Sequence, residues 1–209
     1  MPSSDDLADV RPDVRRLSSR VAYENPWMML TEDVVEHRDG SQGTYAVVHA
    51  PDFSLVVPFD GERYTLVEQF RYTVGLRLWE FPQGSVRDPA GLSAQVIGEI
   101  ELAEEAGLTA ATWTHLGRLH AGYGRSSTAF DVFLAQELNA VPTRREVTEQ
   151  DMRTGTFTLD EIWDLVDQGL VTDSHTVAAL ALLSVLPQQR VHLAPGIFNP
   201  CLLRPMLSL

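Results

Sequence analysis

The sequence predicts one α/β domain, an α/β/α sandwich with mixed β-sheets that begins with an N-terminal β-meander. Three observations support this fold class. The chain has 209 residues, which is enough for a single domain with a buried core. Short runs rich in Val, Tyr and Phe come first, bounded by Gly, Pro and Asp as strands usually are. A helical pattern then separates two groups of strands, and further helical patterns end the domain without an internal repeat.

Strand patterns fill the N-terminal half behind a polar lead at residues 1–20, which we expect to be poorly ordered. The apolar residues of 34–48 predict a hairpin or meander, interrupted by a Gly-containing turn at 39–43. Residues 54–57 and 64–70 predict two more strands, joined by a short Asp-Gly turn.

The central helix follows a strand that runs into a Pro/Gly loop at Trp79–Gly84. Ser93 is the expected N-cap of this helix and Gly107 its expected C′ residue. Between them, apolar side chains recur three and four positions apart, so one face of the helix should pack inward. These side chains are Val96, Ile97, Ile100 and Ala103.

The C-terminal part repeats the pattern of strands followed by helices. Residues 112–119 and 129–135 predict strands on either side of a glycine loop. A long polar connection, 139–153, comes next, and long loops in compact domains are often functional. Two helices are predicted over 158–167 and 174–186, the first with a capping box formed by its Thr and Glu.

These patterns place the folded domain at 21–187 and leave an apolar tail with three prolines at 188–209. The tail is compatible with packing on the domain, packing on a partner subunit, or an unstructured extension.

Composition excludes several classes of partner. The net charge is −13, from 29 acidic and 16 basic residues, which argues against a nucleic-acid surface. Cys201 is the only cysteine, so we expect no intrachain disulfide and a reducing cytoplasm. Residues 1–10 lack the apolar core of a signal peptide, and the apolar run 177–186 is shorter than the ~20 residues of a membrane span. We therefore expect a soluble protein that does not interact with membranes.

Three carboxylates crowd one turn of the central helix. Glu101 and Glu105 are four residues apart, and Glu104 is three from Glu101. Like charges at this spacing repel, and a divalent cation with oxygen ligands would compensate them. A solvated acidic face is the alternative interpretation.

The motifs around these carboxylates resemble those of the Nudix hydrolases, in particular the branch that hydrolyses ADP-ribose and nucleoside diphosphate-sugars. The Nudix box ends in Arg-Glu-aliphatic-any-Glu-Glu-any-Gly-aliphatic, and residues 100–108 match every position except the arginine. The resemblance covers roughly residues 20–185 in motif order. The further matching segments are Trp79-Glu80-Phe81-Pro82-Gln83-Gly84, Asn25-Pro26-Trp27, Val67-Glu68-Gln69-Phe70-Arg71-Tyr72, Phe133-Leu134-Ala135 and Asp173-Ser174-His175-Thr176.

Two charged positions of the box are apolar in this chain. Ile100 occupies the place of the arginine, and Leu92 that of the first box glutamate. The loop after Gly84 is also two residues longer than the pattern, and the nearby Glu99 would point to another side of the helix.

The resemblance implies a Mg²⁺ site, with Mn²⁺ as an alternative ion. Glu101 and Glu105 are the expected metal ligands, and Glu104 is a further ligand or orients the attacking water. The resemblance also implies that the backbone carbonyl of Gln83 completes the metal's ligand shell. Their general base often comes from the loop before the late helix, where Glu149 is our candidate beside Glu146 and Asp151.

Four further residues are candidates for substrate binding, each with a structural alternative. Arg71 would pair with a phosphate or form a surface salt bridge, and Glu80 would contact a sugar or the metal cluster, or pair with Arg71. Trp27, with Tyr23, would stack on a base or belong to the core. Arg125 with its glycines would bend over the diphosphate or form a plain hairpin turn.

These expectations converge on a Mg²⁺-dependent pyrophosphohydrolase that cleaves the diphosphate linkage of a nucleoside diphosphate-sugar such as ADP-ribose. A catalytically weak or inactive nucleotide-sensing domain is the alternative, favoured by Ile100, and a purely structural domain is a third interpretation. The resemblance also implies a homodimer to which the N-terminal strands contribute.

Overall fold

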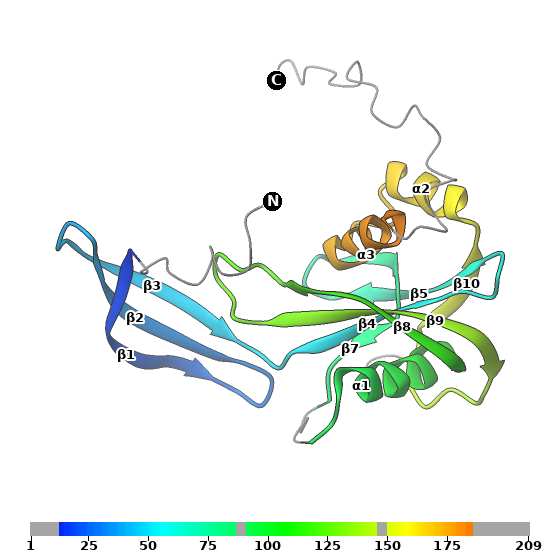
Figure 1. Cartoon of the computed structure of the whole chain (residues 1–209), viewed down its shortest axis with the longest axis horizontal. Helices are drawn as coiled ribbons and strands as arrows, with labels where there is room; N and C mark the ends of the chain where they lie inside the picture. The colour runs from blue at the N-terminus through cyan, green and yellow to red at the C-terminus, as the bar shows by residue number, and fades with distance from the viewer. Residues whose placement is uncertain (1–12, 87–90, 146–149, 186–209) are drawn as a thin grey trace, which may run out of the picture.

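Three β-sheets and three α-helices make up the computed structural model, which describes residues 13–86, 91–145 and 150–185 (Figure 1). The strands are β1 Val14–Glu24, β2 Met29–His37, β3 Gln42–His49, β4 Phe53–Pro58, β5 Tyr64–Arg71, β6 Leu76–Glu80, β7 Gln83–Gly84, β8 Leu108–His120, β9 Ala129–Ala140 and β10 Arg153–Phe157. The helices are α1 Ala94–Glu101, continued by the π-helical turn η2 Leu102–Ala106, then α2 Leu159–Asp167 and α3 Ser174–Ser184.

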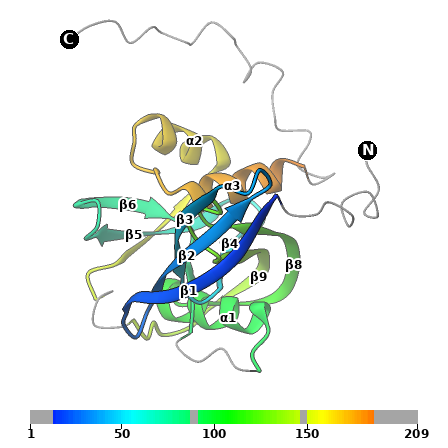
Figure 2. The ribbon, with the colours of Figure 1, turned by 90° about the vertical axis from the view of Figure 1, so that its left-hand side faces the viewer.

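The N-terminal sheet is an antiparallel meander in the order β1-β2-β3, and it projects from the rest of the molecule (Figures 1 and 2). The predicted meander is therefore confirmed. The prediction of a poorly ordered lead over 1–20 is wrong for its last part, because β1 begins at Val14 and pairs with β2. Arg and Ser side chains made this strand look like a polar lead, and it is in fact exposed along almost its whole length.

The body consists of two sheets that share one core. One sheet has the order β7-β4-β9-β8, with β4 and β9 parallel, and the other has the antiparallel order β10-β5-β6. In Figure 1, α2 and α3 lie on one side of these strands and α1 on the other, as expected for an α/β/α sandwich. The mixed sheets are also confirmed. The largest fully buried side chains include Phe81, Phe130, Leu55, Leu66, Ile162 and Leu180.

The central helix begins and ends as predicted but differs in its last turn. Ser93 caps the N-terminus through a hydrogen bond from the Val96 N–H to its side chain, and Gly107 ends the helix with φ 67°. From Leu102 the helix is π-helical, so that the Gly107 N–H donates to the Leu102 carbonyl five residues earlier. Single π turns inside α-helices are rare and are often found at functional sites.

The late helices follow the predicted caps closely. Thr158 and Glu161 form the predicted capping box of α2. Asp173 caps α3, one residue before the predicted start. Strand β10 was not predicted, and it pairs with β5 directly after the long connection. Among the described residues, no helix combines the length and the apolar character that crossing a bilayer requires.

Candidate active site

A cavity of about 620 Å³ opens where the N-terminal sheet meets the body. Its lining brings together four residues that the sequence analysis selected: Trp27, Arg71, Glu80 and Gln83. The rest of the lining comes mainly from the β3–β4 connection, the β5–β6 hairpin and the N-terminus of α3. Segments far apart in the sequence therefore meet at one opening.

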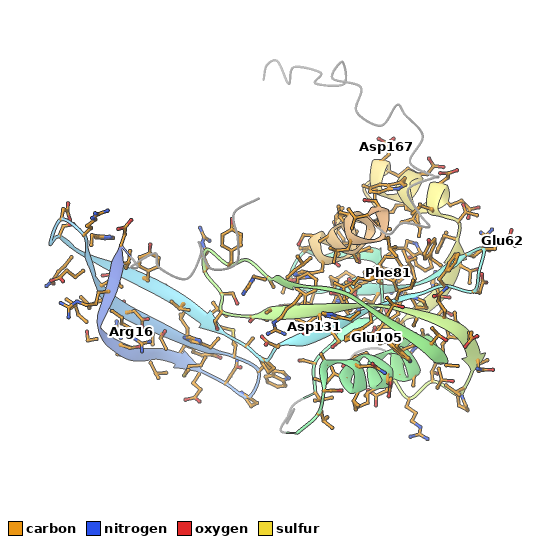
Figure 3. The ribbon with its side chains drawn as sticks, viewed as in Figure 1. Arg16, Glu62, Phe81, Glu105, Asp131 and Asp167 are labelled. Atoms are coloured by element: carbon orange, nitrogen blue, oxygen red, sulfur yellow. The ribbon has the colours of Figure 1, made fainter. Side chains whose placement is uncertain are left out.

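Two buried carboxylates, Glu101 and Glu105, lie behind β7. Glu101 is 8% and Glu105 3% exposed, although both belong to an acidic helix. The Gln83 N–H donates a hydrogen bond of 3.0 Å to Glu105 Oε2. In Figure 3, Glu105 lies on the side of the helix that is turned toward the strands. The alternative interpretation, a solvated acidic face, is wrong for these two residues.

Gly84 makes room for the Glu101 carboxylate. A Cβ atom at position 84 would lie 2.5 Å from Glu101 Oε2 and 2.8 Å from Oε1, closer than real Cβ atoms approach other atoms. Glycine is therefore required so that the carboxylate can lie against the backbone of β7. Both carboxylates are thus held against the same two-residue strand.

Glu104 is placed differently from this pair. It is half-buried and lines a groove of about 440 Å³ on the outer side of the helix, together with Ile100, Ala103 and Val141. Glu99 lines the same groove and is exposed, so the prediction that it points away from the carboxylate pair is confirmed. The structure brings Glu101 and Glu105 together and leaves Glu104 on another face.

The carboxylate oxygens of Glu101 and Glu105 are ligands of the kind that a hard divalent cation binds. Among the described residues, no three His, Cys, Asp or Glu side chains form a set that could hold a metal by side chains alone. Mg²⁺ does not need such a set, since it usually keeps several waters and takes only one or two carboxylates. Here two carboxylates of one helix are buried against the same strand, an arrangement that a cation stabilises.

Arg71 and Glu80 form an ion pair at the wall of the cavity, in which Glu80 is buried and Arg71 half-buried. Arg71 Nη2 donates to Glu80 Oε1, and Arg71 Nε donates to Glu80 Oε2 at 3.1 Å. Gln69 Nε2 adds a hydrogen bond of 2.6 Å to Glu80, which is only 2% exposed. Burial raises the pKa of Glu80 in spite of these donors. The structural alternative for Glu80, a partner for Arg71, is therefore confirmed, while the Arg71 side chain remains 40% exposed beside the cavity.

Asp173 is a member of the site that sequence reasoning missed. Its Oδ2 accepts a hydrogen bond of 2.8 Å from Gln83 Nε2, and it also caps α3 through the Thr176 N–H. Burial alone would raise the pKa of Asp173, but hydrogen bonds from His175, Gln83 and Thr176 outweigh burial and hold it far below its usual range. An Asp before a Ser-His-Thr helix start is an N-cap signal, which would have drawn attention to it. His175 packs edge-on against Phe53 and Phe130 in the first turn of α3.

Trp27 stands at the rim of the cavity rather than in the core. It is 67% exposed, and the turn that carries it is held by Asn25, whose Oδ1 accepts hydrogen bonds from the N–H groups of Trp27 and Met28, each 2.9 Å. The alternative interpretation of Trp27 as a core residue is wrong. Tyr23 is exposed too.

Arg125 and Glu149 lie outside this assembly for different reasons. The Arg125 carbonyl accepts a hydrogen bond of 2.8 Å from the Val48 N–H, and its exposed side chain does not line the cavity. Its loop ties the N-terminal sheet to the body and forms a turn, with a hydrogen bond from the Arg125 N–H to the Gly122 carbonyl. Glu149 and Glu146 fall outside the described residues.

Known proteins share both the sequence pattern and the fold. Residues 14–48 match the family model described as the nucleoside diphosphate sugar hydrolase N-terminal domain. The ADP-ribose pyrophosphatase of Mycobacterium tuberculosis is 32% identical over 170 residues, which cover 80% of this chain and 82% of the relative. The ADP-ribose pyrophosphatase of Bacillus subtilis is 26% identical over 158 residues, covering 75% and 84%. A crystal structure of an ADP compounds hydrolase superposes with a TM-score of 0.73 at 19% identity, covering 83% of this chain and 94% of the other, which confirms the predicted fold class.

Proposed function

The chain belongs to the ADP-ribose pyrophosphatase branch of the Nudix hydrolases, and from this membership we propose that it cleaves the diphosphate linkage of a nucleoside diphosphate-sugar such as ADP-ribose. Membership makes it a pyrophosphohydrolase. The observation that carries the choice of site is the buried pair Glu101 and Glu105, held against β7 beside a cavity of about 620 Å³.

Mg²⁺, with Mn²⁺ as an alternative, is the proposed cofactor. Glu101 and Glu105 would hold it, with the Gln83 carbonyl as a further oxygen donor and Glu104 as an outer ligand or water-orienting group. When bound, the ion would neutralise charge on the phosphate oxygens and lower the pKa of a bound water. The Gln83 N–H contributes by fixing the orientation of the Glu105 carboxylate before substrate arrives.

The walls of the cavity offer one group for each part of such a substrate. Trp27 presents an exposed indole on which a nucleobase would stack. Arg71 brings positive charge to a chain with a net charge of −13, and its partner Glu80 holds the guanidinium in place for a phosphate. Asp173 orients the Gln83 side chain and so restrains β7 from the side opposite the helix.

Two parts of the proposal rest on the resemblance alone, and a third also rests on the exposed surface of the N-terminal sheet. Glu149 is proposed as the general base, and Arg125 as a contact of the diphosphate, although the latter would require its side chain to reach the cavity from the connecting loop. A homodimer is proposed because the N-terminal sheet of the single chain exposes apolar side chains, including Val21, Tyr23 and Tyr45, which a second copy would cover. The cytoplasmic location expected from the single cysteine stays a prediction.

A substrate screen with Mg²⁺ tests the proposed function. ADP-ribose, GDP-mannose, other sugar nucleotides, dinucleoside polyphosphates and NADH would each be incubated with the protein, and monophosphate products would be separated by chromatography. We expect a sugar nucleotide to be split into two products, each carrying one phosphate, with no turnover when the metal is chelated. Tight binding of ADP-ribose in calorimetry without turnover of any compound would instead support the nucleotide-sensing alternative.

A further inference from the structure

The catalytic helix has no basic side chain of its own. Residues 94–106 include Glu99, Glu101, Glu104 and Glu105 but neither Lys nor Arg, because Ile100 stands where the resembling motif has arginine. The carbonyl groups of the last helical turn also carry partial negative charge and lack partners within the helix. A cation supplied from another segment would stabilise this end of the helix.

Arg145 supplies that cation at the end of the helix. Its Nε and Nη2 donate hydrogen bonds of 3.1 and 3.0 Å to the Glu105 carbonyl, while Nη1 donates to the Met152 carbonyl. One half-buried guanidinium thus joins the π-helical turn to the segment that leads into β10. The planar fork of arginine suits such a contact, and lysine cannot reproduce it.

The segment just before Arg145 packs closely against Gly107 at the end of the helix. The Val141 N–H donates a hydrogen bond of 2.8 Å to the Gly107 carbonyl. A Cβ atom at position 107 would lie 2.8 Å from Thr143 Cγ2 and 2.9 Å from the Val141 carbonyl oxygen. Only glycine permits this approach at the observed φ of 67°, so the contact depends on the residue that ends the helix.

We propose that Arg145 is a positioning residue for Glu105. Arg145 donates hydrogen bonds to the Glu105 backbone carbonyl, and the Gln83 N–H donates one of 3.0 Å to the Glu105 carboxylate. Glu105 is therefore held both at its backbone and at the end of its side chain. Arg145 thereby brings positive charge from the β9–β10 connection to a helix that has Ile100 where the resembling motif has arginine. The role toward the metal rests on the proposed function, whereas the role in fixing the π-helical turn does not.

Two substitutions of Arg145 and one of its neighbour form the test. Arg145→Ala removes the contact, Arg145→Lys keeps the charge without the fork, and Arg144→Ala is the matched control, since Arg144 is exposed and lines the outer groove. Mn²⁺ binding would be measured by electron paramagnetic resonance of the free ion, and hydrogen exchange would be followed at the Gly107 amide. The Mg²⁺ concentration for half-maximal activity would be measured alongside, with folding checked by circular dichroism.

We expect Arg145→Ala to weaken Mn²⁺ binding roughly 10-fold to 100-fold and to raise the Mg²⁺ requirement by a similar factor, as loss of groups behind a metal ligand does. Exchange of the Gly107 amide should become faster, Arg145→Lys should lie in between, and Arg144→Ala should match the wild type. A folded Arg145→Ala protein with wild-type Mn²⁺ affinity and wild-type exchange would overturn the proposal. Should Arg145→Ala not fold, Arg145→Lys decides in the same way.

Failure of the proposed function gives a different pattern of results. A wild-type protein that binds Mn²⁺ but hydrolyses no sugar nucleotide would remove the proposed substrate class and leave the exchange and binding comparisons valid. Altered exchange with unchanged Mn²⁺ binding would reduce Arg145 to a structural residue and overturn its role toward the metal.

Discussion

At the residue scale, Gly84 controls the approach of the Glu101 carboxylate. Gly84→Ala would place a Cβ atom 2.5 Å from Glu101 Oε2, so the helix or β7 must move. We expect the free energy of unfolding to fall by about 1–3 kcal/mol, as for other overpacked positions. Mn²⁺ affinity should fall by a larger fraction of its wild-type value than stability does. Urea denaturation and metal titration measure the two effects.

Gly124→Ala is the matched control for that substitution. A Cβ atom there would meet nothing within 4 Å, so stability and metal binding should stay at the wild-type values. Equal effects of the two substitutions would show that the close approach at Gly84 has no special importance.

Asp173 gives the site a pH-dependent contribution to stability. Its pKa in the folded protein is depressed far below the ordinary value of about 4, so the folded state binds fewer protons than the unfolded state. This contribution is fully present above pH ~4 and declines as the pH falls further, toward the folded-state pKa. Asp173→Asn should therefore cost about 1.5–3 kcal/mol at pH 7, because it weakens hydrogen bonds to a charged acceptor, and less at pH ~3.

Denaturation of wild-type protein and Asp173→Asn at both pH values checks this expectation. Asp167→Asn serves as the control, since Asp167 is an exposed residue at the end of α2. A difference between wild type and Asp173→Asn that stays constant with pH would mean that the carboxylate is not specially stabilised in the folded state.

At the element scale, the sequence predicted whole elements better than their irregular parts. Ser93 and Gly107 marked both ends of the central helix, because capping is a local property of a few residues. The π-helical turn between them left no local signal, and its Glu105 carbonyl accepts hydrogen bonds from Arg145, 40 positions away in the sequence. Strand β1 was missed for the opposite reason: its pairing with β2 stabilises it, although its side chains are exposed.

The candidate site shows the same division. Glu101 and Glu105 followed from spacing and motif, because both lie on one short helix. Asp173 did not, since its link to Gln83 joins residues 90 positions apart. The position of Glu104 in the outer groove was not predicted either.

The β1–β2 turn is an element whose function can be tested separately from the metal. Asn25 holds the backbone of Trp27 and Met28 through two hydrogen bonds of 2.9 Å. Asn25→Ala should loosen the turn, so that the indole stacks less well and KM rises severalfold while kcat changes little, the pattern of lost uniform binding. Steady-state kinetics with ADP-ribose measures this, with Asn139→Ala as the control at an exposed position of β9. A fall in kcat at unchanged KM would contradict a role of the turn in ground-state binding.

At the scale of the whole molecule, the layers bring together groups that no single element carries. The helix α1 with η2 supplies the carboxylates, β7 holds them, the β5–β6 hairpin supplies Arg71, and α3 restrains Gln83 through Asp173. The turn between β1 and β2 of the N-terminal sheet adds Trp27 to the cavity. In a chain with a net charge of −13, binding of an anionic diphosphate is helped by local positive charge, which the proposed divalent ion at the buried pair would supply.

The most direct test compares Glu105→Gln with Glu99→Gln in ADP-ribose hydrolysis as a function of Mg²⁺ concentration. Both substitutions remove one negative charge from the same helix, but Glu105 is 3% exposed against β7, whereas Glu99 is an exposed partner of Gln95. We predict that Glu105→Gln loses at least about 100-fold in kcat/KM and binds Mn²⁺ weakly, with its fold retained, and that Glu99→Gln matches the wild type. Normal turnover by folded Glu105→Gln, or an equal loss in both variants, would contradict a metal-dependent active site at Glu101 and Glu105.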